Sequence, residues 1–262
     1  MSNTAIMIIG ICFLFVMTTA GSAAVFLFRK ISQKVNSAFL GFAAGVMIAA
    51  SIWSLLIPAI DASADWGELS FVPAAVGFLV GGLFLVFIDK VVPHMHGGTK
   101  EEEGPTVSMK KSTKLFLAVT IHNIPEGLAV GFAFGAAAVI GTDAAFLSAF
   151  GLALGAGIQN FPEGAAVSLP MKNETGSKTK AFWLGSLSGA VEPVAALIGY
   201  FFASSVATVY PWLLAFAAGA MIFVVAEDLI PDAQQSNQPH LATWGVMFGF
   251  VLMMILDVAL GA

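Results

Sequence analysis

Charge and cysteine are both scarce in this chain. Only 10% of its 262 residues are charged and 58% are hydrophobic, whereas a soluble globular protein carries about 25% charged residues. Cys12 is the single cysteine, so the chain forms no internal disulfide and no thiolate metal site. The composition excludes a soluble domain and predicts an all-α integral membrane protein whose partner is the lipid bilayer. We also expect no nucleic-acid partner and no organic cofactor.

Long apolar runs divide the whole chain, 1–262, into one transmembrane domain. A helix needs about 20 apolar residues to cross a bilayer. The first run lacks the basic residues of a signal peptide and is too long for one, so we expect a retained helix. Eight spans are predicted, at 5–28, 38–60, 71–92, 115–139, 145–170, 181–203, 210–231 and 241–261.

The positions of the basic residues predict the orientation of these spans. With eight helices, all 11 Lys and Arg residues lie on one side of the membrane, and basic loops face the cytoplasm. We therefore expect both termini outside, in a cell (inner) membrane, and the long loop 93–114 in the cytoplasm. The basic residues are Arg29, Lys30, Lys34, Lys90, Lys100, Lys110, Lys111, Lys114, Lys172, Lys178 and Lys180.

Short similarities between spans indicate an internal repeat. The sequence FAAGVMI at 42–48 resembles FAAGAMI at 216–222, and the third and eighth spans contain Ile88-Asp89 and Leu256-Asp257. These matches predict a 3+2+3 arrangement in which helices 1–3 repeat as 6–8 and helix 4 as 5. The second copy would be inverted, as in many transporters, which hold their substrate where the repeats meet.

Two related motifs lie in the fourth and fifth spans, IHNIPEG at 121–127 and IQNFPEG at 158–164. On a helix, His122 and Glu126 share a face, as do Gln159 and Glu163. Each proline removes a backbone donor, and each glycine lets another helix approach closely. The motifs predict a polar cage between two membrane helices.

Three carboxylates in apolar surroundings need compensation: Glu126, Glu163 and Glu192. An ionised side chain near the bilayer centre costs about 2.5–3.5 kcal/mol on insertion scales. A bound divalent cation would neutralise them, and carboxylate, amide and imidazole ligands suit Zn²⁺ and Fe²⁺. The alternative is that these groups join the helices by hydrogen bonds alone.

The two motifs and the eight-helix pattern resemble the ZIP family of divalent metal transporters, in its bacterial branch, over essentially the whole chain. The resemblance implies a metal site, often binuclear, between helices two, four, five and six, and a movement of helices 1, 4, 5 and 6 against 2, 3, 7 and 8. The ligands that it implies are Met47, His122, Asn123, Glu126, Gln159, Asn160, Glu163 and Glu192.

This chain departs from the family pattern at two places. Asn160 stands where some relatives have Asp, which weakens the prediction of a second metal, and Glu227-Asp228 stands where relatives often have His-Glu. Each accessory position has an ordinary interpretation beside the functional one, namely a solvated acid or loop histidine. The candidate entrance and exit residues are Asp61, Asp257, Glu227, Asp228, His94 and His96.

The expected function is uptake of a divalent metal, zinc first and also iron, cadmium or manganese, as transported substrate rather than cofactor. A proton-coupled carrier of another ion is the main alternative. An intramembrane zinc enzyme is disfavoured, because the chain has four histidines and no His-Glu-x-x-His motif. The sequence leaves open whether two chains pair as a homodimer, and whether the pathway is a carrier or a pore.

Overall fold

The computed structural model describes residues 2–28, 32–95, 102–105, 111–205, 209–235 and 239–261. Eight helices in these ranges are long and apolar enough to cross a membrane, which confirms the predicted number of spans. Their bounds are Asn3–Leu27, Gln33–Asp61, Phe71–Val91, Phe116–Ile140, Asp143–Asn173, Lys178–Ser204, Tyr210–Ala233 and His240–Leu260. The second span starts five residues before the predicted position 38, because Ser32 caps it by accepting a hydrogen bond from the Val35 amide.

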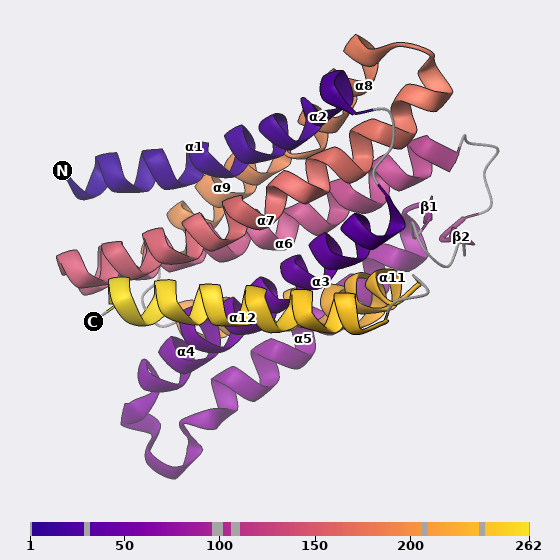
Figure 1. Ribbon diagram of the computed structural model, residues 1–262. Coiled ribbons are helices and arrows are strands. Elements are labelled where there is room, and N and C mark those ends of the chain that lie inside the picture. The colour runs from indigo at the N-terminus through magenta and orange to yellow at the C-terminus, as the bar shows by residue number, and fades with distance from the viewer. Residues whose placement is uncertain are drawn as a thin grey trace.

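Several spans are built from more than one element (Figure 1). The first two comprise α1 (Asn3–Ser22), α2 (Ala24–Leu27), α3 (Gln33–Ala50), the π-helix η1 (Ser51–Leu56) and α4 (Ile57–Asp61). The 3₁₀ turn η2 (Ala64–Leu69), α5 (Phe71–Val91) and the strands β1 (His94–Met95) and β2 (Glu102–Glu103) follow. The rest are α6 (Lys111–Ile140), α7 (Asp143–Thr175), α8 (Lys178–Ser188), α9 (Val191–Ser205), α10 (Tyr210–Val224), the π-helix η3 (Val225–Leu229), α11 (Ile230–Ala233) and α12 (Pro239–Gly261).

The predicted loop 93–114 holds structure at both of its ends. β1 and β2 pair antiparallel, with His94 opposite Glu103, and α6 begins at Lys111, four residues earlier than expected. His96 lies outside the described residues, and only the backbone of His94 is described.

The helices pack as two units, which Figure 1 shows one above the other. The first unit holds α1, α6, α7, α8 and α9, in which α1 packs on α7 and α6 on α9. The second unit holds α3, α5, α10 and α12, in which α3 packs on α12 and α5 on α10. Contacts between the units run from α7 to α3 and α12, and from α6 to α10. This division matches the grouping expected from the family resemblance.

Glycine brings the backbones together in each of these four helix pairs. A Cβ added at such a glycine would lie less than 2.3 Å from a carbonyl oxygen of the partner helix, which no side chain tolerates. Close backbone approach of this kind is how membrane helices gain packing contacts without a hydrophobic driving force. The pairs are Gly164 with Thr18, Gly131 with Ala196, Gly45 with Val246 and Gly81 with Phe216.

A π-helix interrupts the second and seventh spans at matching points. η1 ends at Leu56 and η3 at Leu229, and both are followed by Ile and Pro, so that Pro58 and Pro231 lie two residues beyond. A proline inside a helix removes the donor for the carbonyl four residues earlier, which disturbs hydrogen bonding in the turn that widens. π-segments of this kind are frequent at functional sites.

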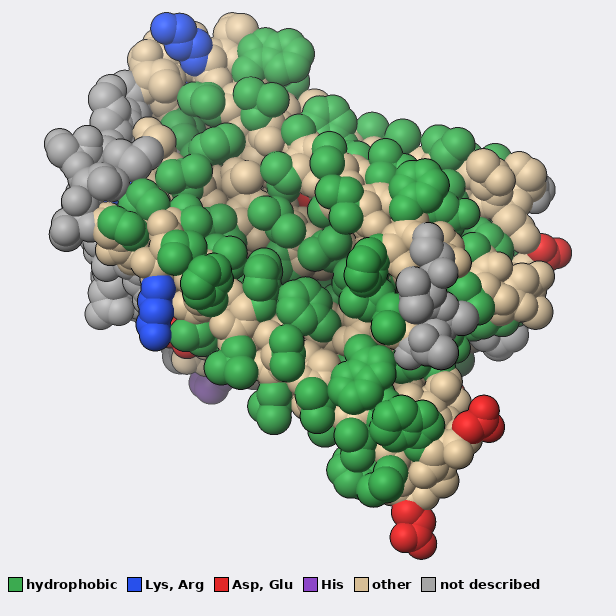
Figure 2. Space-filling view, turned by 180° about the vertical axis from the view of Figure 1, so that it is seen from behind, with side chains coloured by type: hydrophobic (Ala, Val, Ile, Leu, Met, Phe, Trp, Pro, Cys, Tyr) green, Lys and Arg blue, Asp and Glu red, His purple; other side chains and the backbone are tan. Residues whose placement is uncertain are grey.

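Basic and acidic side chains lie mainly at opposite ends of the molecule. Figure 2 shows Lys and Arg gathered at one end and Asp and Glu mainly at the other. The exposed acids Asp65, Glu68 and Asp143 lie where α5 and α7 begin, and Lys178 and Lys180 lie where α8 begins. This separation of charge matches the pattern used above to predict the orientation.

The glycine contacts predict a difference between two substitutions. Gly45→Ala would place a Cβ 2.0 Å from the Val246 oxygen, whereas at Gly82 the nearest atom would be a Phe223 ring carbon at 3.8 Å. We expect Gly45→Ala to cost about 1–3 kcal/mol, the range for overpacked cores, and Gly82→Ala to cost nothing. Thermal unfolding of the two variants in detergent checks this, and equal unfolding midpoints would contradict it.

Candidate metal centre

Six of the predicted ligands are buried polar side chains on α6, α7 and α9. None is more than 8% exposed, and in a membrane span such groups need partners because no solvent hydrogen-bonds them. They are Asn123 and Glu126 on α6, Gln159, Asn160 and Glu163 on α7, and Glu192 in the first turn of α9.

Glu192 is held by donors from two other helices. The Asn160 side-chain nitrogen donates to one carboxyl oxygen, Oε2. The Thr18 hydroxyl of α1 lies 3.2 Å from the other, Oε1, and at the same distance from the Leu14 carbonyl oxygen. Both oxygens of a fully buried carboxyl group are therefore satisfied, which removes most of the cost of burying it.

The glycines of the two motifs place these partners. A Cβ at Gly127 would lie 2.5 Å from the Glu192 carbonyl oxygen, and one at Gly164 would lie 2.1 Å from the Thr18 carbonyl oxygen. Only glycine allows α9 to cross α6, and α1 to cross α7, at these points. The glycine of each Asn-x-Pro-Glu-Gly motif thus brings in the helix that completes the polar cluster.

Backbone carbonyls fix the orientation of both motif asparagines. The Asn123 nitrogen donates to the Ser188 carbonyl at 2.9 Å, and the Asn160 nitrogen to the Leu14 carbonyl at 3.4 Å. With the nitrogens anchored, the amide oxygens are left as acceptors. Among the described residues of this cluster, the buried oxygens that receive no hydrogen bond are Asn123 Oδ1, Asn160 Oδ1, Glu126 Oε2 and Gln159 Oε1.

The three carboxyl groups lie close enough for their charges to interact. The negative charges of Glu163 and Glu192 both act on the Glu126 carboxyl group. The Gln159 side chain lies beside Glu126, but its geometry is outside hydrogen-bond limits. Four acceptor oxygens without a hydrogen bond and the negative charge therefore gather beside a single donor in the same condition, the Gln159 side-chain nitrogen. Such an excess of acceptors is the chemistry that binds a cation. In the described part of the chain, no three His, Cys, Asp or Glu side chains stand together as a preformed metal site.

His122 pairs with an acid from the other unit. Its Nε2 lies 3.1 Å from Asp228 Oδ2 in the π-helix η3. The two neighbouring acids have different environments, because Glu227 is exposed whereas Asp228 is buried, with 7% of its surface exposed. The first motif thus joins the second unit through its histidine.

The remaining candidates lie on other helices. Met47 is buried in α3 at 1% exposure, and Asp61 is exposed at the end of α4. Asp257, expected at an outer mouth, is 7% exposed and accepts a hydrogen bond from Ser54 of η1.

Sequence reasoning missed Thr18 and Ser54, the hydroxyl partners of Glu192 and Asp257. Their only signal is a small hydroxyl inside an apolar helix, which more often bonds its own backbone. The Thr18 hydroxyl lies 3.2 Å from both the Leu14 carbonyl oxygen and Glu192 Oε1, so its single proton is shared between a backbone and a side-chain acceptor.

Thr18 and its neighbour allow a matched test of the Glu192 support. Thr18→Val keeps the shape but removes the hydroxyl that donates to Glu192, whereas the Thr19 hydroxyl is buried and has no hydrogen-bond partner. We expect Thr18→Val to lower stability by about 1–3 kcal/mol and Thr19→Val to leave it unchanged, as measured by unfolding in detergent. If the two variants unfold alike, Thr18 does not support Glu192.

Comparison with known proteins identifies this arrangement. A family model described as "ZIP Zinc transporter" matches residues 111–257, more than half of the chain. Zinc transporter ZIP11 of Xenopus tropicalis is 41% identical, with 94% of both chains covered, and ZIP11 of Homo sapiens is 39% identical, with 97% of both covered. Among bacterial relatives, zinc transporter GufA of Myxococcus xanthus is 37% identical over 93% of this chain and 94% of its own.

These relatives are named as transporters, which confirms that the chain is not an enzyme. The eight spans and the relatives together make it a multi-pass membrane protein. The chain therefore belongs to the ZIP family of zinc transporters, and its function is the transport of divalent metal, zinc in particular.

Proposed function

We propose that the chain takes up zinc across the cytoplasmic membrane through the buried cluster on α6, α7 and α9. The observation that carries this proposal is the set of buried acceptor oxygens that receive no hydrogen bond from the protein, beside three interacting carboxyl groups. Hydrogen-bonded helix contacts alone would pair these oxygens with donors. A divalent cation satisfies several of them at once and cancels the negative charge.

In this mechanism the metal approaches from the acidic end, where exposed carboxylates raise the local concentration of cations. The ion then exchanges its water for oxygens of Glu126, Glu163, Gln159 and Asn123, with the His122 nitrogen and the Met47 sulfur as softer ligands. Iron, manganese and cadmium accept overlapping ligand sets, so we extend the proposal to them as secondary cargo.

Release is toward the basic, cytoplasmic end, as the family resemblance implies, and the contacts of His122 link release to the arrangement of the two units. This side chain belongs to the first motif and also contacts Asp228 of the other unit. A metal that takes the Nε2 atom as a ligand has to displace Asp228, and when the metal leaves, the contact re-forms. Binding and release of cargo are thereby linked to a contact between the two units.

Alternating access would arise from movement of the first unit against the second. Helix pairing supports the inverted repeat behind this idea. If spans 1–3 repeat as 6–8 and span 4 as 5, the pair α1–α7 corresponds to α9–α6, and α3–α12 corresponds to α10–α5. All four of these pairs are present, and both π-helices fall in repeat-related spans.

A proton-coupled carrier of another ion is the competing proposal, because carboxyl groups also relay protons. It predicts proton flux that does not depend on metal. The amide oxygens of the motifs favour the metal, since they coordinate cations but do not titrate.

The proposal predicts that two carboxylates are indispensable. In proteoliposomes loaded with a zinc-sensitive dye, we expect zinc influx with the wild type and influx at the level of protein-free liposomes with the double variant Glu126→Ala/Glu163→Ala. The variant Lys180→Gln, at an exposed position of the basic end, serves as control and should transport normally. Transport that survives the double substitution would overturn the proposed site, and zinc binding without flux would overturn the transport path through it.

The contact between His122 and Asp228 makes a second prediction with a definite sign. If Asp228 competes with the metal for His122, Asp228→Asn should tighten zinc binding, by about five-fold for a hydrogen-bond difference of about 1 kcal/mol. Weaker binding would instead make Asp228 a metal ligand. Titration calorimetry distinguishes the two, with the exposed neighbour Glu227→Gln as the matched control.

A further inference from the structure

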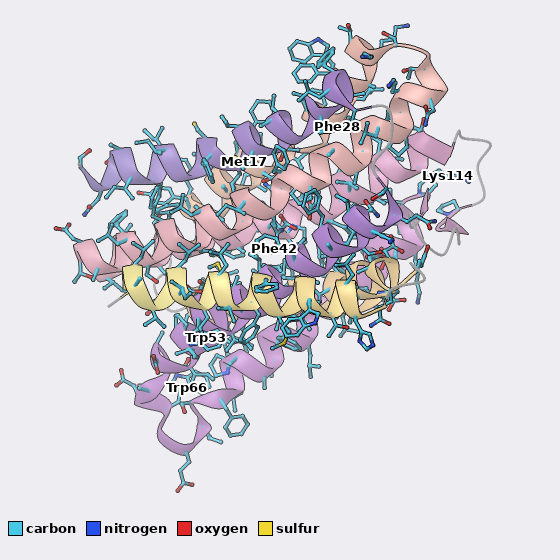
Figure 3. The ribbon with its side chains drawn as sticks, in the orientation of Figure 1. Met17, Phe28, Phe42, Trp53, Trp66 and Lys114 are labelled. Carbon is cyan, nitrogen blue, oxygen red and sulfur yellow. The ribbon has the colours of Figure 1, made fainter. Side chains whose placement is uncertain are left out.

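An apolar groove opens between the two units, on the side of the molecule where α12 crosses α7. Its volume is about 390 Å³, within the range of sites that hold small ligands. Phe42, labelled in Figure 3, lies between the ribbons of α7 and α12. The walls come from three helices and include Ala38 and Phe42 of α3, Phe161 and Pro162 of α7, and Trp244 and Phe248 of α12.

The groove exists because α3 and α12 meet through the small residues Ala38 and Gly245, which leave space that larger side chains would fill. A Cβ at Gly245 would lie 2.5 Å from the Ala38 carbonyl oxygen, so α3 and α12 touch backbone to backbone at its floor. The rims are large apolar side chains that remain partly outside, with Phe161 36%, Trp244 59% and Phe248 65% exposed. Such a hollow in a membrane span faces hydrocarbon rather than water, because its lining offers almost no polar surface.

The groove occupies one leaflet of the membrane. Along α12 it runs from Leu241 to Phe248, about 10 Å at 1.5 Å per residue, whereas the hydrocarbon core is about 30 Å thick. Leu241 is the second residue of its span, and Ala38 is the sixth of its own. The groove therefore begins at the membrane boundary at the basic end of the molecule.

Polar groups stand where a lipid headgroup would lie. Lys34 is exposed and lies one helical turn before Ala38 on the same face of α3, and His240 lies one turn before Trp244 on α12. A cation and a potential donor at the mouth of an apolar groove favour an anionic headgroup with its chain inside. Trp244 is of the type enriched at the headgroup level.

We propose that this groove binds one acyl chain of an anionic phospholipid whose headgroup contacts Lys34. The acyl chain fills the groove, whose apolar lining residues would otherwise lack packing contacts on that side. Since α7 belongs to the first unit and α3 and α12 to the second, the bound lipid touches both units and braces them against each other. Lipid composition would then set how readily the units move.

The test uses the full chain in nanodiscs of equal phosphatidylglycerol and phosphatidylcholine, with retained lipid counted by native mass spectrometry. We expect the wild type to retain one phosphatidylglycerol. Ala38→Trp fills the groove and should lower retention about ten-fold, whereas Leu83→Trp, on the exposed face of α5, should not. If Ala38→Trp does not fold, Leu241→Trp fills the same groove from the α12 wall.

The headgroup contact is tested separately. Lys34→Ala should leave one lipid bound but remove the preference for phosphatidylglycerol over phosphatidylcholine, while Lys90→Ala, at the exposed end of α5, should keep that preference. The proposal is overturned if both tryptophan variants retain lipid equally, or if the preference survives Lys34→Ala. It is also overturned if added oleate replaces the phospholipid or if a second copy of the chain covers the groove.

Discussion

Burial of negative charge inside the membrane is the constraint on which this structure depends. Glu126, Glu163 and Glu192 lie where no bulk water reaches, so each carboxyl oxygen needs a donor or a cation. For Glu192 the donors come from α1 and α7, and the motif glycines allow the close crossings of α1 with α7 and of α9 with α6 beside it. Helix packing and metal binding are therefore linked, because the glycine that permits each close crossing belongs to the same short motif as the proposed ligands.

The contacts inside each unit differ in kind from the contacts between the two units. Within each unit, glycine sets backbone against backbone, and such contacts allow little sliding. At the boundary, Gly155 of α7 instead faces the sulfur of Met253 on α12, and thioether side chains repack at small cost. The apolar groove lies along the same boundary. One unit can move against the other only if each unit is rigid inside and the interface between them can repack. The backbone contacts within the units and the side-chain contacts between them have these two properties.

Hydropathy and two motifs predicted much of this architecture before any coordinates. Eight apolar runs gave the eight spans, because a bilayer demands a minimum length of apolar helix, and the motifs predicted which polar groups are buried. The π-helices could not be read in this way, since they depend on how a proline is accommodated by neighbouring helices. Thr18 was missed because a lone hydroxyl in an apolar run has no periodicity, and its partner Glu192 lies 174 residues away. Asp257 was expected at the outer mouth as an acid that attracts cations. Its hydrogen bond with Ser54 is a tertiary contact, which hydropathy does not predict.

The pairing of His122 with Asp228 connects the proposed metal site, whose six buried residues lie on helices of the first unit, to the second unit. A site enclosed by a single rigid bundle would bind the ion in the same way in every state. A ligand that also contacts the opposite unit binds the ion differently once the units move, and only a difference in affinity between states can drive such a movement. His122 lies on α6, whose other neighbours in the cluster belong to the first unit, while Asp228 is held in a widened turn of the second. In the proposed mechanism, this one side chain supplies the unequal contact that a carrier needs and that a pore does not.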